Sequence, residues 1–364
     1  MKLIAIDGRL IDFKMRGMGV FIFNVVINLS CSIKDNEKLI IFTNKKSTSV
    51  LLNSKINNKN VRIVFFNINE LIYEQIILPI AVVLHCPDYF LHSGNTCSLI
   101  FPPIKRGMLI HDVSYLSPDI NLKANNVYRA LGRLYRKLTV TIASKFVDHI
   151  FTVSHFAKND IISRLNCGLK DKIKVVYNGV DLSKFTPELS TKKENQVLFV
   201  SGSDRQKNLK KFLKRVINFE KRLNDLKFIV IGVSSASELG LTEVESISYM
   251  GHLTGEELIN MYKSSKYFVI PSLYESFGIP GIEALAAGCI LYASKGGALP
   301  EIYQDHASFF SGSSDEEIDN VILDILNGPS EVDIKKNLMY VAKYNWSAVA
   351  DAVLQEMRKS IIDN

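Results

Sequence analysis

The chain has 364 residues, of which 47% are hydrophobic and 22% charged, and its formal net charge is +7. This composition excludes an intrinsically disordered chain, and the length suggests two domains that each bury a core. The longest strongly apolar stretch, residues 76–84, contains Pro79 and is much shorter than the roughly 20 residues of a membrane-spanning helix. The five cysteines are scattered without a CxxC pair, which indicates reduced cytosolic thiols rather than disulfides or a metal site.

The charge is distributed unevenly along the chain. Up to Lys184 there are 25 Lys and Arg against 13 Asp and Glu, whereas from Thr186 onward there are 19 against 24. A basic first half indicates an anionic partner for that half. A general lysine bias of the source proteome is the alternative interpretation.

Short apolar runs alternate with longer amphipathic stretches from one end of the chain to the other. The amphipathic stretches include residues 209–219, 255–264 and 317–326. This alternation predicts an α/β fold with parallel sheets wound by helices. A turn at 177–181 and the polar stretch after it predict domains over residues 1–185 and 186–345, with a terminal amphipathic helix over 346–364.

Two segments of the first half place candidate ligand-binding residues after predicted strands. Gly17 and Gly19 follow the first strand and precede an apolar helical run, although a lone Gly-x-Gly is a weak signal. His111 and Asp112 end a later strand, at the carboxyl end where α/β sheets bind ligands. A single histidine can equally be structural, and both interpretations stay open for His111.

Residues 123–145 form a basic amphipathic segment. It contains six basic residues and no acidic one: Lys123, Arg129, Arg133, Arg136, Lys137 and Lys145. The middle four fall at helical spacing on one side, with apolar residues interleaved. This pattern predicts a helix that lies on an anionic membrane surface, and an ordinary helix packed on the core is the alternative.

The second half opens with a strand and a tight loop over residues 199–208. Arg205 and Lys207 lie at the exit of this loop, just before a predicted helix. Two cations at such a place could offset the charge of a pyrophosphate, although basic residues beside helices are often only solvated.

Residues 272–288 form the most informative segment. Pro280 suits the first turn of a helix, so the preceding loop leads into a helix N-terminus that can bind phosphate. Glu275 and Glu283 bracket the start of this helix, and carboxylates accept hydrogen bonds from sugar hydroxyls. The helix dipole also favours a glutamate in a first turn, which is the structural alternative for Glu283.

The pattern of Glu275, seven residues, Glu283 and then Gly296-Gly297 before Glu301 resembles the signature of glycosyltransferase family 4. The resemblance implies the GT-B architecture, in which two Rossmann-like domains face a cleft and the terminal helix crosses back to the first domain. The first domain would bind the acceptor and the second the nucleotide sugar.

The resemblance also implies roles for individual residues. Glu275 would contact the donor sugar, Glu283 the ribose, and Arg205 and Lys207 the diphosphate, although the loop before Arg205 is shorter here than in the family. The implied donor-binding residues are Gly17, Gly19, Arg205, Lys207, Glu275, Phe277, Gly278, Ile279 and Glu283. The implied catalytic residues are Glu275, His111, Lys207 and Arg205. The acceptor side and membrane surface would include Arg129, Arg133, Arg136 and Lys137.

By the same resemblance, the reaction is retaining transfer of a hexose from a nucleoside-diphosphate sugar, with the departing diphosphate acting as the base. The opening at Ile6–Arg9 resembles mannose-transferring members in bacterial surface-polysaccharide assembly, so GDP-mannose is the expected donor. The acceptor would be a glycan or polyprenyl-linked chain on the cytoplasmic face of the inner membrane. We expect no cofactor and no nucleic-acid partner. We also expect no metal, because the chain has no Asp-x-Asp triplet.

Two other functions stay open at this point. A GT-B-fold epimerase or phosphorylase would share the architecture, although no landmark for the cofactor lysine of a phosphorylase is found. A transferase-like binding subunit without activity is the non-enzymatic alternative, and the presence of Glu275, Glu283 and Lys207 argues against it.

Overall fold

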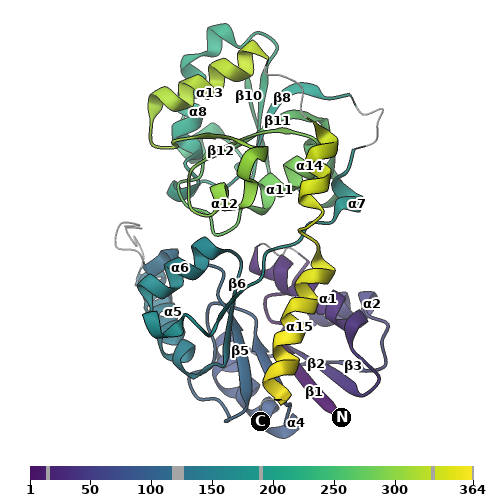
Figure 1. Cartoon of the computed structure of the whole chain (residues 1–364). Helices are drawn as coiled ribbons and strands as arrows, with labels where there is room; N and C mark the ends of the chain where they lie inside the picture. Colours follow the sequence, from purple (N-terminus) through teal and green to yellow (C-terminus); the bar gives the residue numbers. More distant parts are fainter. Residues whose placement is uncertain (14–16, 117–126, 188–191, 329–332, 363–364) are drawn as a thin grey trace. The chain divides into compact units, whose positions relative to one another are not determined.

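The computed structural model describes residues 1–13, 17–116, 127–187, 192–328 and 333–362. The chain divides into two compact units, Met1–Gly179 with Trp346–Asn364, and Val180–Asn345 (Figure 1). Both are parallel α/β structures, which confirms the predicted fold class. In the described ranges, no helix is long and apolar enough to cross a bilayer.

The first unit is built on a seven-stranded parallel sheet in the order β3-β2-β1-β4-β5-β6-β7. Its strands are β1 (Lys2–Asp7), β2 (Glu37–Thr43), β3 (Val61–Phe65), β4 (Tyr89–His92), β5 (Lys105–Leu109), β6 (His149–Thr152) and β7 (Ile173–Val175). Its helices are α1 (Met18–Ser32), α2 (Lys46–Lys55), α3 (Glu70–Ile72), the π-helix η1 (Tyr73–Ile77), α4 (Leu78–His85), α5 (Val127–Phe146), α6 (His155–Arg164) and α15 (Trp346–Ile362).

The strand register shows which helices of the first unit share a face of the sheet. Phe90 pairs with Ala5 of β1, and His92 pairs with Met108 of β5, so Phe90 and Met108 point to the same face. Helices η1 and α4 pack in the cluster that contains Phe90, and α5 packs in the cluster that contains Met108. Helices η1, α4 and α5 therefore cover one face. The terminal helix α15 packs against α1, β4 and β5.

The second unit contains a six-stranded parallel sheet in the order β10-β9-β8-β11-β12-β13. Its strands are β8 (Glu194–Val200), β9 (Lys227–Ile231), β10 (Ile247–Gly251), β11 (Ser265–Ile270), β12 (Ile290–Ser294) and β13 (Ser308–Phe310). Its helices are α7 (Leu182–Phe185), α8 (Leu209–Asn218), α9 (Ala236–Leu239), α10 (Gly255–Ser264), α11 (Ile279–Ala286), α12 (Leu299–Tyr303), α13 (Asp315–Asn327) and α14 (Ile334–Val341). Helices α8, α10 and α13 occupy the three amphipathic stretches that the sequence indicated.

The chain passes between the units at two places. The first lies after Gly179, a few residues before the predicted boundary at residue 185, because α7 packs against α10 and α11 and its Phe185 contacts the ring of Tyr262. The second lies between Asn345 and Trp346, where the terminal helix was expected to begin. Within the first unit, Gly179 lies so close to Trp346 that an added Cβ would fall 2.6 Å from its ring.

Candidate active site

Glu275 lies in the loop between β11 and α11 and forms the centre of a polar cluster. Its Oε1 accepts hydrogen bonds from Lys207 Nζ at 2.7 Å and from Ser272 Oγ at 2.8 Å. Both partners of the ion pair keep solvent access, with 18% of the Glu275 side chain and 36% of the Lys207 side chain exposed. The pair contributes little to stability because it is partly exposed. The same exposure leaves both groups accessible to a ligand.

Lys207 reaches Glu275 because neighbouring strands bring their carboxyl ends together. Strand β8 pairs with β11, and Lys207 follows β8 in the short 3-10 turn Arg205–Lys207. Asn208, which comes next, has a left-handed backbone with φ of 55°. Its Nδ2 donates to the carbonyl oxygens of Pro271 at 3.1 Å and Gly312 at 2.7 Å, which fixes the turn to the end of β11.

Gly296 and Gly297 pack closely against the backbone of the Glu275 loop. A Cβ on Gly296 would lie 2.2 Å from the carbonyl oxygen of Ser272, and one on Gly297 would lie 2.2 Å from that of Glu275. The Ala298 N–H donates to the Glu275 carbonyl at 2.8 Å. The two glycines of the signature therefore have a steric role, because any side chain here would displace the loop that carries Glu275.

The N-terminus of α11 is held by Tyr303. Gly278 caps the helix with φ of 89°, and the Tyr303 hydroxyl donates to its carbonyl oxygen at 2.6 Å. A Cβ on Gly278 would lie 2.3 Å from that hydroxyl, and one on Gly281 would lie 2.4 Å from the Tyr303 ring. Phe277, just before the cap, is buried. Of the first three residues of α11, Pro280 has no N–H and Gly281 donates its N–H to the Gly278 carbonyl at 3.1 Å, so the Ile279 N–H is the one that can meet a ligand at the carboxyl end of β11.

Glu283 lies on α11 and is partly buried. Its Oε2 accepts a hydrogen bond from the Tyr262 hydroxyl at 2.8 Å. Burial raises the pKa of Glu283 to about 7, and the Tyr262 bond opposes this rise. The carboxyl can thus carry a proton near neutral pH, and it can then donate as well as accept a hydrogen bond. Arg205 is exposed on the turn before Lys207 and makes no ion pair within the described ranges.

In the first unit, His111 and the loop before α1 lie at the carboxyl edge of the sheet. Gly17, with φ of 41°, precedes α1, and Gly19 is buried in its first turn. The ring of His111 packs edge-on against Phe21 of α1 with centroids 5.1 Å apart. Burial lowers the pKa of His111 to about 3, so its imidazole is neutral, and its Nε2 has no hydrogen-bond partner among the described residues.

A buried ionic cluster fixes the loop that follows β1. Arg9, with 2% of its side chain exposed, places Nε 3.2 Å from Asp7 Oδ2 and Nη1 2.5 Å from Glu74 Oε1. Its Nη2 donates to the Thr96 carbonyl at 2.8 Å. Burial raises the pKa of Asp7, and the Arg9 charge opposes that rise. This cluster was not predicted from the sequence, which singled out Asp7 and Arg9 only as part of a family-like opening.

The basic residues of α5 are placed only in part. Arg129 lies outside the residues whose side chains the structure describes. Arg136 and Lys137 are exposed and Arg133 is partly buried, with the guanidinium of Arg136 over the Tyr115 ring at 5.3 Å.

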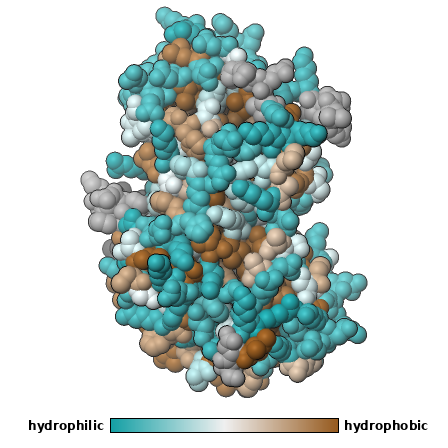
Figure 2. All heavy atoms as spheres, in the orientation of Figure 1, coloured by the Kyte–Doolittle hydropathy of each residue, from teal (hydrophilic) through white to brown (hydrophobic). Residues whose placement is uncertain are grey.

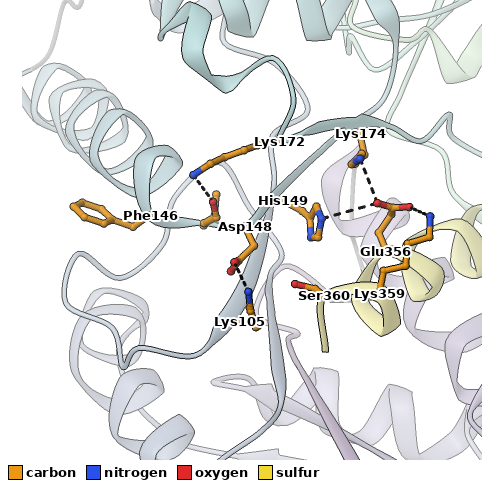
Figure 3. Close-up of a pocket in the computed structure, with 10 residues that line it drawn as sticks. Lys105, Phe146, Asp148, His149, Lys172, Lys174, Glu356, Lys359 and Ser360 are labelled. Carbon is orange, nitrogen blue, oxygen red and sulfur yellow. Dashed lines mark hydrogen bonds and ion pairs between the residues drawn. The ribbon is translucent and has the colours of Figure 1, made fainter. Parts of the chain in front are cut away.

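A depression at the amino ends of β5, β6 and β7 is lined by further lysines (Figure 3). Its cations are already paired within the protein. Glu356 of α15 lies 2.6 Å from Lys359 and 3.4 Å from Lys174, and Lys105 lies 3.5 Å from Asp148. The residues around this depression therefore hold α15 against the sheet, at the end of the strands opposite to His111.

Two family models match consecutive parts of the chain. The Glycosyltransferase Family 4 model matches residues 52–184, and the model for Glycosyl transferases group 1 matches residues 183–344. The chain belongs to the family 4 glycosyltransferases.

Several curated proteins are similar to this chain. The O-antigen chain mannosyltransferase RfbU of Salmonella typhimurium is 25% identical over 230 residues, which cover 61% of this chain and 63% of that protein. The uncharacterized glycosyltransferase MJ1607 of Methanocaldococcus jannaschii is 30% identical over 174 residues, covering 42% of this chain and 44% of that protein. The chain thus spans less than two thirds of the length of these relatives.

Solved structures share the fold over nearly the whole chain. Sucrose-phosphate synthase from Thermosynechococcus elongatus has a TM-score of 0.76 at 16% identity and full coverage of both chains. WaaG, a glycosyltransferase involved in lipopolysaccharide biosynthesis, has a TM-score of 0.64 at 12% identity, with 95% of this chain and 94% of that chain covered. These likenesses confirm the GT-B architecture.

Proposed function

We propose that this protein is a retaining glycosyltransferase that moves a hexose from a nucleoside-diphosphate sugar to a glycan or polyprenyl-linked acceptor in surface-polysaccharide assembly. The observation that carries the proposal is the Lys207–Glu275 pair at the start of α11. It brings a cation for the diphosphate together with a carboxylate for the sugar, just before the N-terminus of α11.

The carboxylate of Glu275 is suited to hold the donor sugar. Lys207 and Ser272 both bind Oε1, and Oε2 accepts no hydrogen bond from the described residues. The oxygen Oε2 can therefore accept a bond from a sugar hydroxyl without displacing the lysine. Lys207 keeps two further N–H donors for a phosphate oxygen.

The reaction that we propose needs no covalent intermediate on the protein. The bond between the sugar anomeric carbon and the diphosphate oxygen breaks, and the acceptor oxygen bonds to the same face of that carbon. The acceptor proton passes to the departing diphosphate. Lys207, Arg205 and the N-terminus of α11, through the Ile279 N–H, stabilise the charge that develops on the diphosphate. In this scheme Glu283 binds the ribose, and the neutral His111, with Gly17 and Gly19, is proposed to contact the donor sugar.

Three points of the proposal concern the donor, the metal and the membrane. GDP-mannose is the proposed donor, supported by the mannosyltransferase names of RfbU and of WbdA from Escherichia coli. WbdA is 30% identical over 122 residues, which cover 33% of this chain and 15% of that protein. We propose that turnover needs no metal, because Lys207 and Arg205 offset the negative charge of the diphosphate.

The basic residues of α5, among them Arg136 and Lys137, would hold the first unit on the anionic cytoplasmic face of the inner membrane.

A donor assay tests the proposal. A thermal-shift screen of nucleotide sugars first finds the one that stabilises the protein, and its turnover is then followed with and without EDTA. We expect GDP-mannose to give the largest shift, GDP to be released in EDTA, and proton NMR to show the retained anomer first. Isomerised sugar without transfer would indicate an epimerase, and binding without turnover on any acceptor would indicate an inactive subunit.

A further inference from the structure

We propose that the first unit inserts an apolar face, formed by α5, the helical segment 70–85 and residues 99–100, into the acyl-chain region of an anionic bilayer. The inference rests on the proposed membrane location and deepens it, because surface charge alone would hold the protein only at the headgroups. Of 21 exposed large apolar side chains in the described parts of the chain, 13 lie on these three segments.

Helix α5 carries an exposed apolar stripe along its outer side. Leu131, Leu134 and Leu138 are each at least 50% exposed, and Ile142 continues the row at 39%. The spacing of three and four residues puts them on one side of the helix. The opposite side packs on the core through Val140, so the stripe faces away from the sheet.

The helical segment 70–85 repeats this arrangement. It runs through α3, η1 and α4 without a break, and the π turn accommodates Pro79 at the start of α4. Tyr73 and Leu78 face the core, whereas Ile76 and Ile80 are at least half exposed. This is the stretch that the sequence marks as the most apolar of the chain, and half of it does not contribute to the core.

Gln75 joins the three segments. Its Nε2 donates to the Tyr135 hydroxyl of α5 at 2.6 Å, and its Oε1 accepts from the Leu99 N–H at 3.1 Å. Ile76 is the next residue, Leu134 adjoins Tyr135, and Ile100, 84% exposed, adjoins Leu99. The exposed apolar groups therefore flank one hydrogen-bonded centre. Figure 2 views the unit from the side of α15, where hydrophilic side chains cover much of the surface and apolar ones lie between them.

Charge complementarity identifies the partner as a membrane. Helix α5 has no acidic residue, and Lys137 and Lys145 are exposed beside its apolar stripe. Arg106 adds a cation at the far end, where its Nε donates to the Phe146 carbonyl at 3.4 Å. An apolar band bordered by cations matches an anionic leaflet, in which acyl chains lie beneath phosphate headgroups.

The first experiment measures co-sedimentation with vesicles of phosphatidylcholine, with or without phosphatidylglycerol. We expect binding to anionic vesicles that persists in part at about 0.5 M salt, where surface charges are screened. The variant Ile76→Ser, Leu134→Ser, Leu138→Ser should lose that salt-resistant part by roughly tenfold or more. The control Met339→Ser, which changes an exposed residue of the second unit, should bind like the wild type.

The second experiment reports insertion directly. The chain has one tryptophan, so Leu138→Trp adds a single reporter, which acyl-chain-brominated lipids should quench, whereas Met339→Trp should show no added quenching. Binding that salt abolishes completely, no quenching of the Leu138→Trp reporter, or dimerisation through this face without vesicle binding would overturn the proposal. Donor turnover is followed in parallel, because a soluble nucleotide sugar needs no membrane and its loss would count against the proposed function instead.

Discussion

The Tyr262 hydroxyl donates to Glu283 Oε2 at 2.8 Å and thereby ties α10 to the helix that begins the candidate donor site. Tyr262 itself is buried and stacks on Phe268 of β11, with ring centroids 5.4 Å apart. The carboxyl of Glu283 is therefore held in a fixed position by a group that cannot move independently of the sheet. Its position and its protonation are both set by this packing.

The raised pKa of Glu283 predicts a pH dependence of stability. The folded protein binds this proton up to about pH 7, whereas the unfolded chain releases it near 4.5. The stabilisation that this bound proton provides is thus complete below pH 4.5 and is lost as the pH rises to 7. Relative to Glu283→Gln, the free energy of unfolding of the wild type should fall by roughly 1–2 kcal/mol between pH 5 and 8, since the side chain keeps some exposure. Urea unfolding of both proteins measures this, and an unchanged difference would contradict the pKa.

Replacing Gly278 should disturb the start of α11. In Gly278→Ala, the new methyl group meets the Tyr303 hydroxyl and the backbone keeps a strained φ of 89°. We expect a loss of about 1–3 kcal/mol in stability and weaker nucleotide binding. Adding Tyr303→Phe removes the clashing oxygen and should recover part of the loss. If denaturation shows that the stability loss of the double variant equals the sum of the two single losses, the contact is unimportant.

Asn208 is predicted to position Lys207. Asn208→Ala removes two hydrogen bonds to buried carbonyl groups and strains the left-handed backbone, and Asn208→Gly removes only the bonds. Each should lower stability by about 1–3 kcal/mol, with the glycine variant less affected. If Asn208 positions Lys207, kcat should fall in the glycine variant, which keeps the backbone geometry. Full activity in that variant would limit Asn208 to a stabilising role.

The buried charge of Asp7 predicts a large effect on the first unit. Asp7→Ala leaves Arg9 with one carboxylate partner in place of two, and should destabilise the unit by about 3–5 kcal/mol. Asp12→Ala is a matched control, because Asp12 forms an exposed pair with Lys45 and should contribute less than about 1 kcal/mol. Equal effects of the two substitutions on thermal unfolding would contradict the structural role of the cluster.

The sequence predicted the parts of this structure that depend on local pattern. The helical stretch 255–264, the loop before Pro280 and the α/β class could be read because periodicity and turn residues are local signals. The pairing of Lys207 with Glu275 joins residues 68 positions apart, and the sequence did not predict it; the resemblance to a family implied only that both bind the donor. Tyr303 carries no local signal of its role, because that role depends on a contact with Gly278.

The apolar stretch 76–84 shows a further limit of the sequence. Its composition could indicate a buried strand or a buried helix, and periodicity does not separate the two for a short run. The π turn at Tyr73–Ile77 sets which side chains face outward. The exposed position of Ile80 therefore follows from the structure alone.

The most direct test of the account is nucleoside-diphosphate binding by Lys207→Ala. Among GDP, UDP and ADP, calorimetry first selects the one that binds the wild type most tightly. Losing a charge-assisted hydrogen bond of about 1.5–3 kcal/mol should raise the dissociation constant roughly tenfold to more than a hundredfold. Lys210→Ala, which removes an exposed lysine three residues further on, should bind like the wild type. Wild-type affinity in Lys207→Ala would show that the diphosphate binds elsewhere.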